Sequence, residues 1–251
     1  MASFFFAPSI VYCIRINVGT MAQFLKLKDC TKCKRKIDLF KFISDEELAE
    51  INESRYEVKF NRGETIFKQG TSLTHIACIT SGVVKVFIEG FHNKNLILKL
   101  VSPGNMIGGP GMYTDFRHHF SATAVEDTTA CFIDASLFND ILKRNITLAN
   151  ELLRQGNERD KMLFEKLLTL TQKQMPGRVA DTLLYLHRAI YKTNPFYMTI
   201  SRQDLAEMSS MTKESVIRIL KDFKDAEFIT VNKDEVKILN EKALINISET
   251  G

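Results

Sequence analysis

The chain has 251 residues, of which 45% are hydrophobic and 25% are charged, an ordinary globular composition that allows one or two domains, each with its own core. The net charge of +4 excludes no class of partner. Its distribution is more informative, because residues 171–224 hold nine Lys and Arg against five Asp and Glu, while the remainder is balanced at 25 against 25. This basic region suits an anionic partner, although a solvated charged face has the same composition.

The five cysteines are odd in number and lack the spacing of a disulfide framework, which favours a reducing, cytoplasmic location. Residues 1–20 are apolar, but they lack a basic start and are too short a run to span a bilayer, so we expect no membrane association. Met21 begins a more natural N-terminus. We therefore expect residues 1–20 to be an upstream-start extension or a poorly ordered arm rather than a signal peptide. Mass spectrometry of the native protein would distinguish Met1 from Met21 as its start.

The first elements in chain order are a short helix and a series of strands. Residues 44–52 predict a helix, with Ser44 as the N-cap and Glu47 completing a capping box. Residues 56–138 then alternate short apolar runs with glycines: YEVKF, ETIF, HIACIT, VVKVFIE, LILKLV, SATAV and ACFID. Strands separated by glycine turns predict an antiparallel sandwich or roll.

After Ser136 the apolar period becomes helical. Eight positions follow alternating steps of three and four residues, and we call them the seam: Ile146, Ala149, Leu153, Gly156, Asp160, Leu163, Leu167 and Leu170. This pattern is typical of a two-helix coiled coil, although a helix packed on its own domain remains an alternative. Two Asp160 carboxylates facing each other would repel, so we hypothesise that Asp160 tunes the strength of the dimer.

The C-terminal part predicts a winged helix-turn-helix. Pro176 and Gly177 are expected to end the long helix, and a second helix is expected over 178–191, followed by an extended segment, FYMTI. Ser201 caps a helix that reaches about Met208, Ser209 and Ser210 form a turn, and Thr212 caps a helix that reaches about Ala226. The runs at 228–231 and 236–239, joined by a turn at 232–234, predict a hairpin that forms the wing.

The second helix of this pair carries the candidate base-reading residues. Its inner face is expected to be Val216, Ile219, Leu220 and Phe223. The residues left outside near its N-terminal half are Lys213, Glu214, Ser215 and Arg218. In a helix-turn-helix such residues meet base edges in the major groove, where Arg reads guanine and Glu accepts a hydrogen bond from cytosine. Ser201, Arg202 and Gln203, at the start of the first helix, are placed to contact phosphates. An ordinary helical hairpin with a charged face is the alternative.

Two segments resemble one family. FNRGETIFKQGTSLTHIACITSGVVKVF (60–87) resembles the cyclic-nucleotide-binding roll of CRP/FNR-type bacterial regulators, and ISRQDLAEMSSMTKESVIRIL (200–220) resembles their recognition unit. The resemblance covers about residues 38–245. It implies an α+β fold with an N-terminal antiparallel β-roll, a long dimerisation helix and a C-terminal winged helix-turn-helix. The expected boundaries are 1–37 for an arm that is disordered or loosely held, 38–144 for the roll, 145–172 for the dimerisation helix and 173–251 for the DNA-binding domain.

The resemblance also implies roles for individual residues. Glu214 and Arg218 match the family's base-reading Glu and Arg, while Lys213 stands where only one branch has a base-contacting Arg. Ser201, Arg202, Gln203 and Lys221 match backbone-contacting positions. The implied partners are a second copy of the chain, RNA polymerase and a palindromic DNA site with TGA in each half. One departure is Ser210, where the family has Gly.

The family's phosphate cassette is altered in this chain. The family uses a Glu for the ribose hydroxyl and an Arg for the cyclic phosphate, in Phe/Ile-Gly-Glu-Leu-Ala and Arg-Ser/Thr-Ala elements. Here Gly108 is followed by Gly109, which occupies the position of the family's Glu, and Phe120 occupies the position of its Arg. Of the polar residues of the cassette, only Ser121 is retained. Without the Arg, a buried phosphate loses a charge-assisted bidentate pair, and we predict no binding of cAMP or cGMP. Arg117 could compensate if the loop shifts.

Cysteines in the N-terminal arm raise the question of a cofactor. Cys30 and Cys33 form C-x-x-C among lysines, where the FNR branch holds cluster cysteines, but the spacing differs from that pattern. An iron–sulfur cube needs four thiolates, and zinc would need further ligands. Packing cysteines, a thiol switch, and a metal or cluster site therefore remain open, as does haem. The five histidines offer no diagnostic pair, and we expect His118 and His119 to lie in an exposed loop.

The sequence predicts a homodimeric, sequence-specific DNA-binding transcription regulator that does not respond to cAMP. The alternative is a ligand- or redox-sensing protein-interaction module with a vestigial helix-turn-helix. No P-loop, nucleophile elbow or HExxH motif is present in the sequence, so we predict that the chain is not an enzyme.

Overall fold

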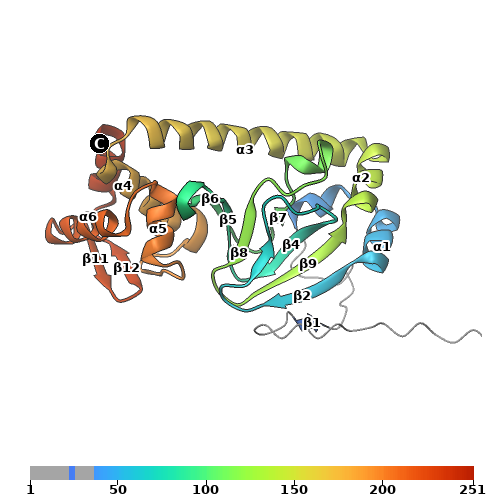
Figure 1. The fold of residues 1–251 in the computed structure, drawn as a ribbon, viewed down its shortest axis with the longest axis horizontal. Coiled ribbons are helices and arrows are strands. Elements are labelled where there is room, and N and C mark those ends of the chain that lie inside the picture. The colour runs from blue at the N-terminus through green and yellow to red at the C-terminus, as the bar shows by residue number, and fades with distance from the viewer. Residues whose placement is uncertain (1–22, 26–36) are drawn as a thin grey trace, which may run out of the picture.

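A long helix, α3 (Ile146–Gln172), lies along one side of the molecule and joins the two halves (Figure 1). The structure, a computed structural model, describes residues 23–25 and 37–251. The expectations for residues 1–20 and for Cys30 and Cys33 lie outside these residues. The predicted order of β-roll, long helix and winged helix-turn-helix is confirmed.

The roll consists of two antiparallel sheets. One has the order β1-β2-β9-β4-β7: Gln23–Leu25, Tyr56–Phe60, Thr128–Asp134, His75–Ser81 and Met106–Ile107. The other has the order β3-β8-β5-β6: Thr65–Phe67, Ser121–Ala124, Val84–Ile88 and Leu96–Val101. All seven predicted strands are confirmed. The sequence analysis missed β7, which is very short, and β1, which joins part of the expected arm to the edge of the roll through pairing with β2.

Buried residues of both sheets face one another and form the core of the roll. Members of this core include Val58, Ala77, Val84, Ala122 and Phe132, each 7% exposed or less. Burial alternates along part of β9, whereas the five central residues of β4 are all buried, so the short apolar runs between glycines predicted the strands more reliably than a strict period of two.

Gly82 shows why glycine is needed between strands β4 and β5. Its φ is +78°, and a Cβ at this position would lie 2.4 Å from the Thr128 Oγ1 and 2.5 Å from the Asp127 carbonyl oxygen. Any side chain would therefore be strained by both the backbone conformation and the lack of space.

Short helices flank the strands of the roll. Their bounds are Asp38–Phe42 for η2, Asp45–Ser54 for α1, Phe91–Asn93 for η3, Pro110–Tyr113 for η4 and Ala135–Arg144 for α2. The predicted capping box of α1 is confirmed, because the Ser44 N–H donates to Glu47 Oε2 at 3.0 Å and the Glu47 N–H donates to Ser44 Oγ at 3.2 Å.

Helix α3 spans Ile146–Gln172, and its N-cap Asn145 accepts a hydrogen bond from the Leu148 N–H. The chain breaks at Lys173, which has extended backbone angles, and α4 then runs over Met175–Tyr185. The predicted break at Pro176 and Gly177 was therefore placed too late: Pro176 lies in the first turn of α4, where its missing N–H has no intrahelical partner to lose.

The C-terminal half combines helices with a small three-stranded sheet. After the π-helix η5 (Leu186–Tyr191), its elements are β10 (Phe196–Tyr197), α5 (Arg202–Ser209), α6 (Lys213–Asp225), β11 (Ile229–Asn232), β12 (Glu235–Ile238) and α7 (Glu241–Thr250). The sheet order is β10-β12-β11. The paired helices and the hairpin are confirmed, whereas α7, which packs against α4, was not predicted.

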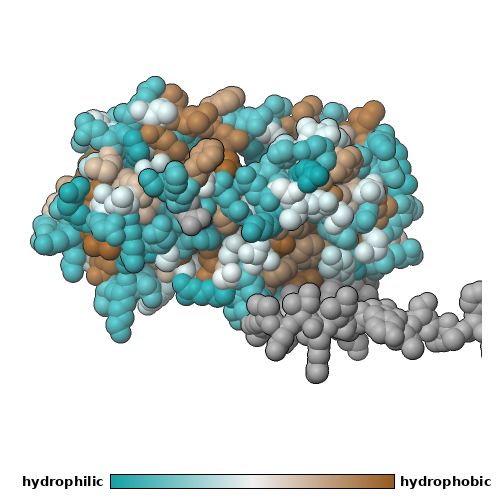
Figure 2. Space-filling model, viewed as in Figure 1, coloured by the Kyte–Doolittle hydropathy of each residue, from teal (hydrophilic) through white to brown (hydrophobic). Residues whose placement is uncertain are grey.

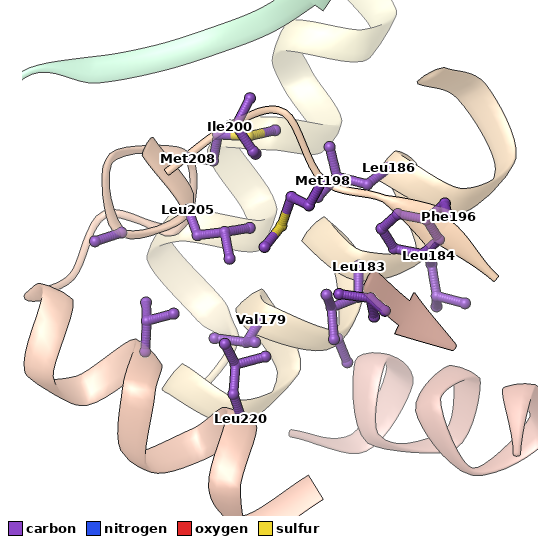
Figure 3. Packing of buried hydrophobic residues seen from close by; sticks show 14 of the residues in the cluster. Val179, Leu183, Leu184, Leu186, Phe196, Met198, Ile200, Leu205, Met208 and Leu220 are labelled. Carbon is purple, nitrogen blue, oxygen red and sulfur yellow. The ribbon is translucent and has the colours of Figure 1, made fainter. Parts of the chain in front are cut away.

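One hydrophobic core joins this half to the roll. Figure 3 shows Leu183 of α4, Leu205 of α5 and Leu220 of α6 pointing into a common interior. The same core includes five buried residues of the roll: Val83, Phe87, Ile97, Leu100 and Val125. The roll and the C-terminal half are therefore packed tightly together.

Candidate nucleic-acid interface and sensor cavity

The turn between α5 and α6 is built from local hydrogen bonds. Ser201 caps α5, since the Asp204 N–H donates to Ser201 Oγ at 3.1 Å and the Ser201 N–H donates to Asp204 Oδ2 at 2.8 Å. Helix α5 ends at Ser209, and Ser210 adopts a left-handed conformation with φ 51°. The sequence analysis noted Ser where the family has Gly, and this backbone conformation accounts for the preference.

Helix α6 presents one charged face and buries the other. Thr212 caps it, with the Ser215 N–H donating to Thr212 Oγ1 at 3.2 Å. The predicted inner face is confirmed as buried: Val216, Ile219, Leu220 and Phe223. The charged candidates are all exposed: Lys213, Glu214, Arg218 and Lys221. Ser215 is half-buried.

Figure 2 shows hydrophilic residues at the outer end of α6 and at the tip of the β11–β12 hairpin. A helix face of this kind can enter a DNA groove while the hairpin contacts the backbone beside it.

The residues predicted to contact phosphates differ in their exposure and in the hydrogen bonds they already form within the protein. Ser201 and Gln203 are exposed at the start of α5, although the Gln203 amide donates to Glu207 Oε1 at 3.2 Å. Arg202 is half-buried, and its guanidinium donates to the Lys233 carbonyl oxygen at 3.0 Å in the hairpin turn. Partial burial lowers the pKa of Arg202, which remains a cation. Arg202 thus links α5 to the wing in addition to any role at DNA.

Polar contacts tie the roll and α3 to the C-terminal half. Lys85 Nζ of β5 lies 2.6 Å from Asp204 Oδ1 of α5, and the side chains are only 20% and 11% exposed. Burial would raise the pKa of Asp204, but the hydrogen bonds from Lys85 and Ser201 outweigh it and hold the pKa below its ordinary value.

Three further contacts each join a side chain to a backbone group. The Arg62 guanidinium donates to the Thr199 carbonyl oxygen at 3.1 Å, and the Leu100 N–H donates to the Tyr185 hydroxyl at 3.1 Å. Lys166 of α3 donates to the Met208 carbonyl oxygen at 2.5 Å. The sequence analysis identified none of these pairs, because nothing in the local pattern relates their members.

Most of the seam of α3 faces solvent, while Ala149, Gly156 and Leu170 are half-buried. Ile146 is 73% exposed, Leu153 65%, Leu163 41% and Leu167 59%, and Asp160 is exposed among them. The residues that α3 buries are Leu148 and Leu152, which lie outside the seam. Figure 2 shows hydrophobic side chains gathered along the edge that α3 forms. The start of α3 therefore packs on its own domain through Leu148, Ala149 and Leu152, as the alternative expects, whereas the large apolar residues of the seam are left exposed.

The structure separates the five candidate effector-pocket residues. Gly108, Gly109 and Phe120 line a cavity of about 1080 Å³ between the roll, α3 and the C-terminal half. Arg117 lines a different hollow, and its guanidinium donates to the Gly70 carbonyl oxygen at 2.9 Å. In this conformation Arg117 does not reach the cassette, so its replacement of the missing cassette Arg stays a prediction that requires the loop to shift.

Ser121, the surviving cassette residue, is buried and already satisfied. Its hydroxyl donates to Glu89 Oε1 at 2.5 Å and accepts from the Gln69 N–H at 2.9 Å. The Ser121 hydroxyl, which corresponds to the family's phosphate-binding Ser or Thr, therefore already donates its hydrogen bond to the Glu89 carboxylate. Phe120 lies across the other altered position, since a Cβ on Gly109 would be 3.2 Å from the Phe120 ring.

The cavity also holds cations that the sequence analysis missed. Lys99 comes from β6, and Arg159 and Lys166 come from α3. Burial, together with the smaller effect of the neighbouring Arg159 charge, lowers the pKa of Lys99 to about 8. Burial also lowers the pKa of Lys166 to about 8. No sequence pattern could have predicted that these cations share a cavity, because they come from separate elements that meet only in the folded protein.

Two expectations about metal-binding residue types can be compared with the described residues. Within residues 23–25 and 37–251, no three His, Cys, Asp or Glu side chains are grouped so that they could hold a metal ion. His118 is not in an exposed loop as expected: it is 3% exposed and stacks on Phe67 with ring centroids 4.1 Å apart. His119 is exposed and lies 3.0 Å from Asp115 Oδ1.

None of the described helices has both the length and the apolar character that crossing a bilayer requires.

Known proteins resemble the chain in both halves. Residues 57–145 match the cyclic nucleotide-binding domain family, and residues 177–247 match the Crp-like helix-turn-helix domain family. The transcriptional activator protein Anr of Pseudomonas protegens is 26% identical over 183 residues, which cover 71% of this chain and 75% of Anr. The cAMP-activated global transcriptional regulator CRP of Salmonella typhimurium is 27% identical over 180 residues, which cover 69% of this chain and 85% of CRP.

Solved structures share the fold. FixK2 from Bradyrhizobium japonicum has a TM-score of 0.72 at 19% identity and covers 78% of this chain and 98% of its own. A CooA mutant from Carboxydothermus hydrogenoformans has a TM-score of 0.68 at 19% identity and covers 89% and 98%.

A nucleotide-binding-type roll joined by a long helix to a winged helix-turn-helix defines a class of protein, the DNA-binding transcription regulators. The chain belongs to the CRP/FNR family of these regulators.

Proposed function

We propose that the protein is a homodimeric, sequence-specific regulator that reads a palindromic DNA site and does not respond to cAMP. The observation that carries the proposal is the exposed charged face of α6, which coincides with an unpaired apolar seam on α3. Two α6 helices presented by a symmetric pair read two half-sites. The protein would act on RNA polymerase in the cytoplasm and would not be an enzyme.

The exposed seam supports dimerisation. Apolar side chains at alternating steps of three and four leave a stripe along α3 that water covers in a single chain. A second α3 would bury this stripe in knobs-into-holes packing, which is favourable for apolar surface. Sedimentation equilibrium tests this: the seam predicts a dimer, and Leu163→Glu, which places a charge in the stripe, is expected to produce monomers.

Glu214 and Arg218 are proposed to read bases, in half-sites that contain TGA or a close relative. Both side chains are exposed on α6, and neither forms an ion pair with another described residue. Fluorescence anisotropy on a TGA-containing palindrome and its single-base variants is the test. Glu214→Ala and Arg218→Ala are expected to cost about 1–3 kcal/mol on the preferred site and to relax discrimination at one base position each.

Lys221 serves as the matched control because its predicted contact is to the backbone. Lys221→Ala is expected to weaken binding to all duplexes alike and to reduce the slope of log K against log salt by about 1. A uniform effect of all three substitutions would refute the assignment of base-reading roles, and equal binding of the unmodified protein to every duplex would refute the proposed function.

Lack of response to cAMP is proposed from the altered cassette. A cyclic phosphate would find the Phe120 ring in place of an Arg, and the Glu89 carboxylate already bonded to Ser121. An anion beside a carboxylate is unfavourable in a partly buried site. Isothermal titration calorimetry is expected to detect no cAMP binding, and micromolar affinity would overturn this part of the proposal.

A further inference from the structure

One residue on the charged face of α6 is apolar. Ile217 is 48% exposed, whereas the apolar residues on the inner face of the same helix are buried. Residues four positions apart lie on the same side of a helix, so Ile217 is placed between Lys213 and Lys221, one turn from each. Helix α6 lies at the end of the C-terminal half that is remote from the roll (Figure 1). Ile217 therefore belongs to the face that is proposed to enter the DNA groove, although the sequence analysis did not include it among the base-reading residues.

The isoleucine contributes little to the stability of the single chain at this position. A β-branched side chain is a poorer helix former than the Lys, Glu and Arg that fill the rest of the face. About half of its surface stays in water, so folding gains only part of the energy that burying an isoleucine can supply. Single exposed apolar residues are common on protein surfaces, but this one lies on the surface proposed to contact DNA. Ile217 gains the rest of its burial only when a partner covers α6.

The major groove offers one apolar group to such a side chain. The charged neighbours of Ile217 can pair with phosphates or with the donors and acceptors of base edges, but an isoleucine can do neither. Thymine alone among the four bases presents a methyl group in the major groove, at C5, and apolar side chains contact it there. The first torsion angle of a helical isoleucine has one strongly preferred value, so the side chain loses little freedom when it docks against such a group.

We propose that Ile217 determines part of the DNA specificity by apolar contact with the 5-methyl group of one thymine in each half-site. The proposal rests on the proposed function, in which α6 lies in the major groove, and it adds a base contact that involves no hydrogen bond. Ile217 lies three residues after Glu214 and directly before Arg218. The thymine is therefore expected within or next to the base pairs that these two residues read.

The test removes a single methyl group from the DNA. Deoxyuridine differs from thymidine only by the absence of the 5-methyl group, so each thymine of a TGA-containing palindrome is replaced in turn, in both half-sites at once. Fluorescence anisotropy is expected to show weaker binding of the unmodified protein at one thymine position, by about fourfold per half-site, which corresponds to the burial of about one methyl group. Replacement of the other thymines should have little effect.

Substitutions of Ile217 show whether this residue makes the contact. Ile217→Ala should weaken binding to the thymine duplex by a similar factor and should no longer distinguish thymine from uracil at that position. Ile217→Val, which keeps a branched apolar side chain, should still distinguish them. Leu239→Ala is the matched control, because Leu239 is also 48% exposed but lies after β12 and outside α6. Comparing each protein on both duplexes separates the contact from any general effect of uracil on the shape of the DNA.

The dependence on salt separates this contact from a contact with the DNA backbone. An apolar contact with a base releases no counterion, so Ile217→Ala should leave the slope of log K against log salt unchanged. Lys221→Ala, which removes a predicted phosphate contact, should reduce that slope. A reduced slope in Ile217→Ala would show that the substitution disturbs the docking of α6 as a whole, and it would contradict the assigned role.

The proposal is overturned if Ile217→Ala and the unmodified protein respond equally to uracil at every position, or if Leu239→Ala abolishes the response as well. Circular dichroism of each variant establishes that it is folded. If the protein prefers the palindrome and Glu214→Ala and Arg218→Ala relax its specificity, but no thymine depends on Ile217, this inference fails and the proposed function stands. Equal binding to every duplex would refute the proposed function, and the inference with it.

Discussion

Replacing Lys85 with methionine breaks the ion pair that ties the roll to the first helix of the helix-turn-helix. The Lys85 Nζ lies 2.6 Å from Asp204 Oδ1, with side chains 20% and 11% exposed. Removing one partner of a fully buried pair costs about 3–5 kcal/mol, whereas exposed pairs contribute about 0–1 kcal/mol. Since the Asp204 carboxylate keeps its hydrogen bonds from Ser201, we expect Lys85→Met to lower the free energy of unfolding by about 2–3 kcal/mol.

Urea denaturation measures this loss, and Lys143→Met is the matched control. The Lys143 Nζ lies 2.8 Å from Asp140 Oδ1, a similar distance, but both side chains are 67% exposed. Removing this pair is expected to cost less than about 0.5 kcal/mol. Hydrogen exchange gives a local measurement, because amides of α5 should exchange faster in Lys85→Met while those of α1, at the far end of the roll, should not change.

A double-mutant cycle with Asp204→Asn separates the pair from other effects of each substitution, and we expect a coupling energy above about 1 kcal/mol. If Lys85→Met is no more destabilising than Lys143→Met, the interdomain ion pair does not stabilise the docked arrangement and the reasoning from its burial is wrong.

Three further predictions concern the cavity, the seam and one turn. Lys99→Met should raise the free energy of unfolding at pH 7 by about 1–3 kcal/mol, because folding lowers the Lys99 pKa from 10.5 to about 8 and the charged lysine therefore destabilises the folded protein. This gain is complete below pH 8 and should disappear as the pH rises to 10.5. Urea denaturation at pH 7 and at pH 10.5 measures it. Asp160→Ala should tighten the dimer by about threefold in sedimentation equilibrium by removing repulsion across the seam, and an unchanged constant would contradict that role. Gly82→Ala should lower the free energy of unfolding, measured by thermal denaturation, by more than about 3 kcal/mol, because the added Cβ would lie 2.4 Å from Thr128 Oγ1. Gly63 has a similar φ of +87° but open space around it, so Gly63→Ala should cost only about 1–2 kcal/mol. Equal losses in the two variants would refute the steric account.

Local pattern was enough to predict most of the secondary structure. The capping boxes at Ser44 and Ser201 involve residues three positions apart, so their physics is contained in a few letters of the sequence. The strands were predicted by short apolar runs between glycines, and the buried face of α6 follows from a period of 3.6 residues. The exposed face of α6 was predicted for the same reason, since a helix that buries Val216 and Leu220 must turn Glu214 and Arg218 outward.

Local pattern was misleading where neighbours in sequence take separate paths in space. Arg117 lies close to Phe120 in the chain and was a candidate for the same pocket, but the loop turns its guanidinium toward Gly70. Histidine is a polar residue and was expected in an exposed loop, yet the His118 ring stacks against Phe67 in the interior. Each outcome depends on the path of a loop, which a periodic pattern does not encode.

The sequence by itself determined the two halves, the helix between them and the side of α6 that faces outward, because these follow from spacing within single elements. Tertiary structure alone decided that Lys85 would meet Asp204, 119 residues away, and that Lys99 would share a cavity with Arg159. The physical reason is that such pairs form when separate elements are packed against each other by a shared apolar core, and the charges they bring together are then set by the packing and not by the chain around them.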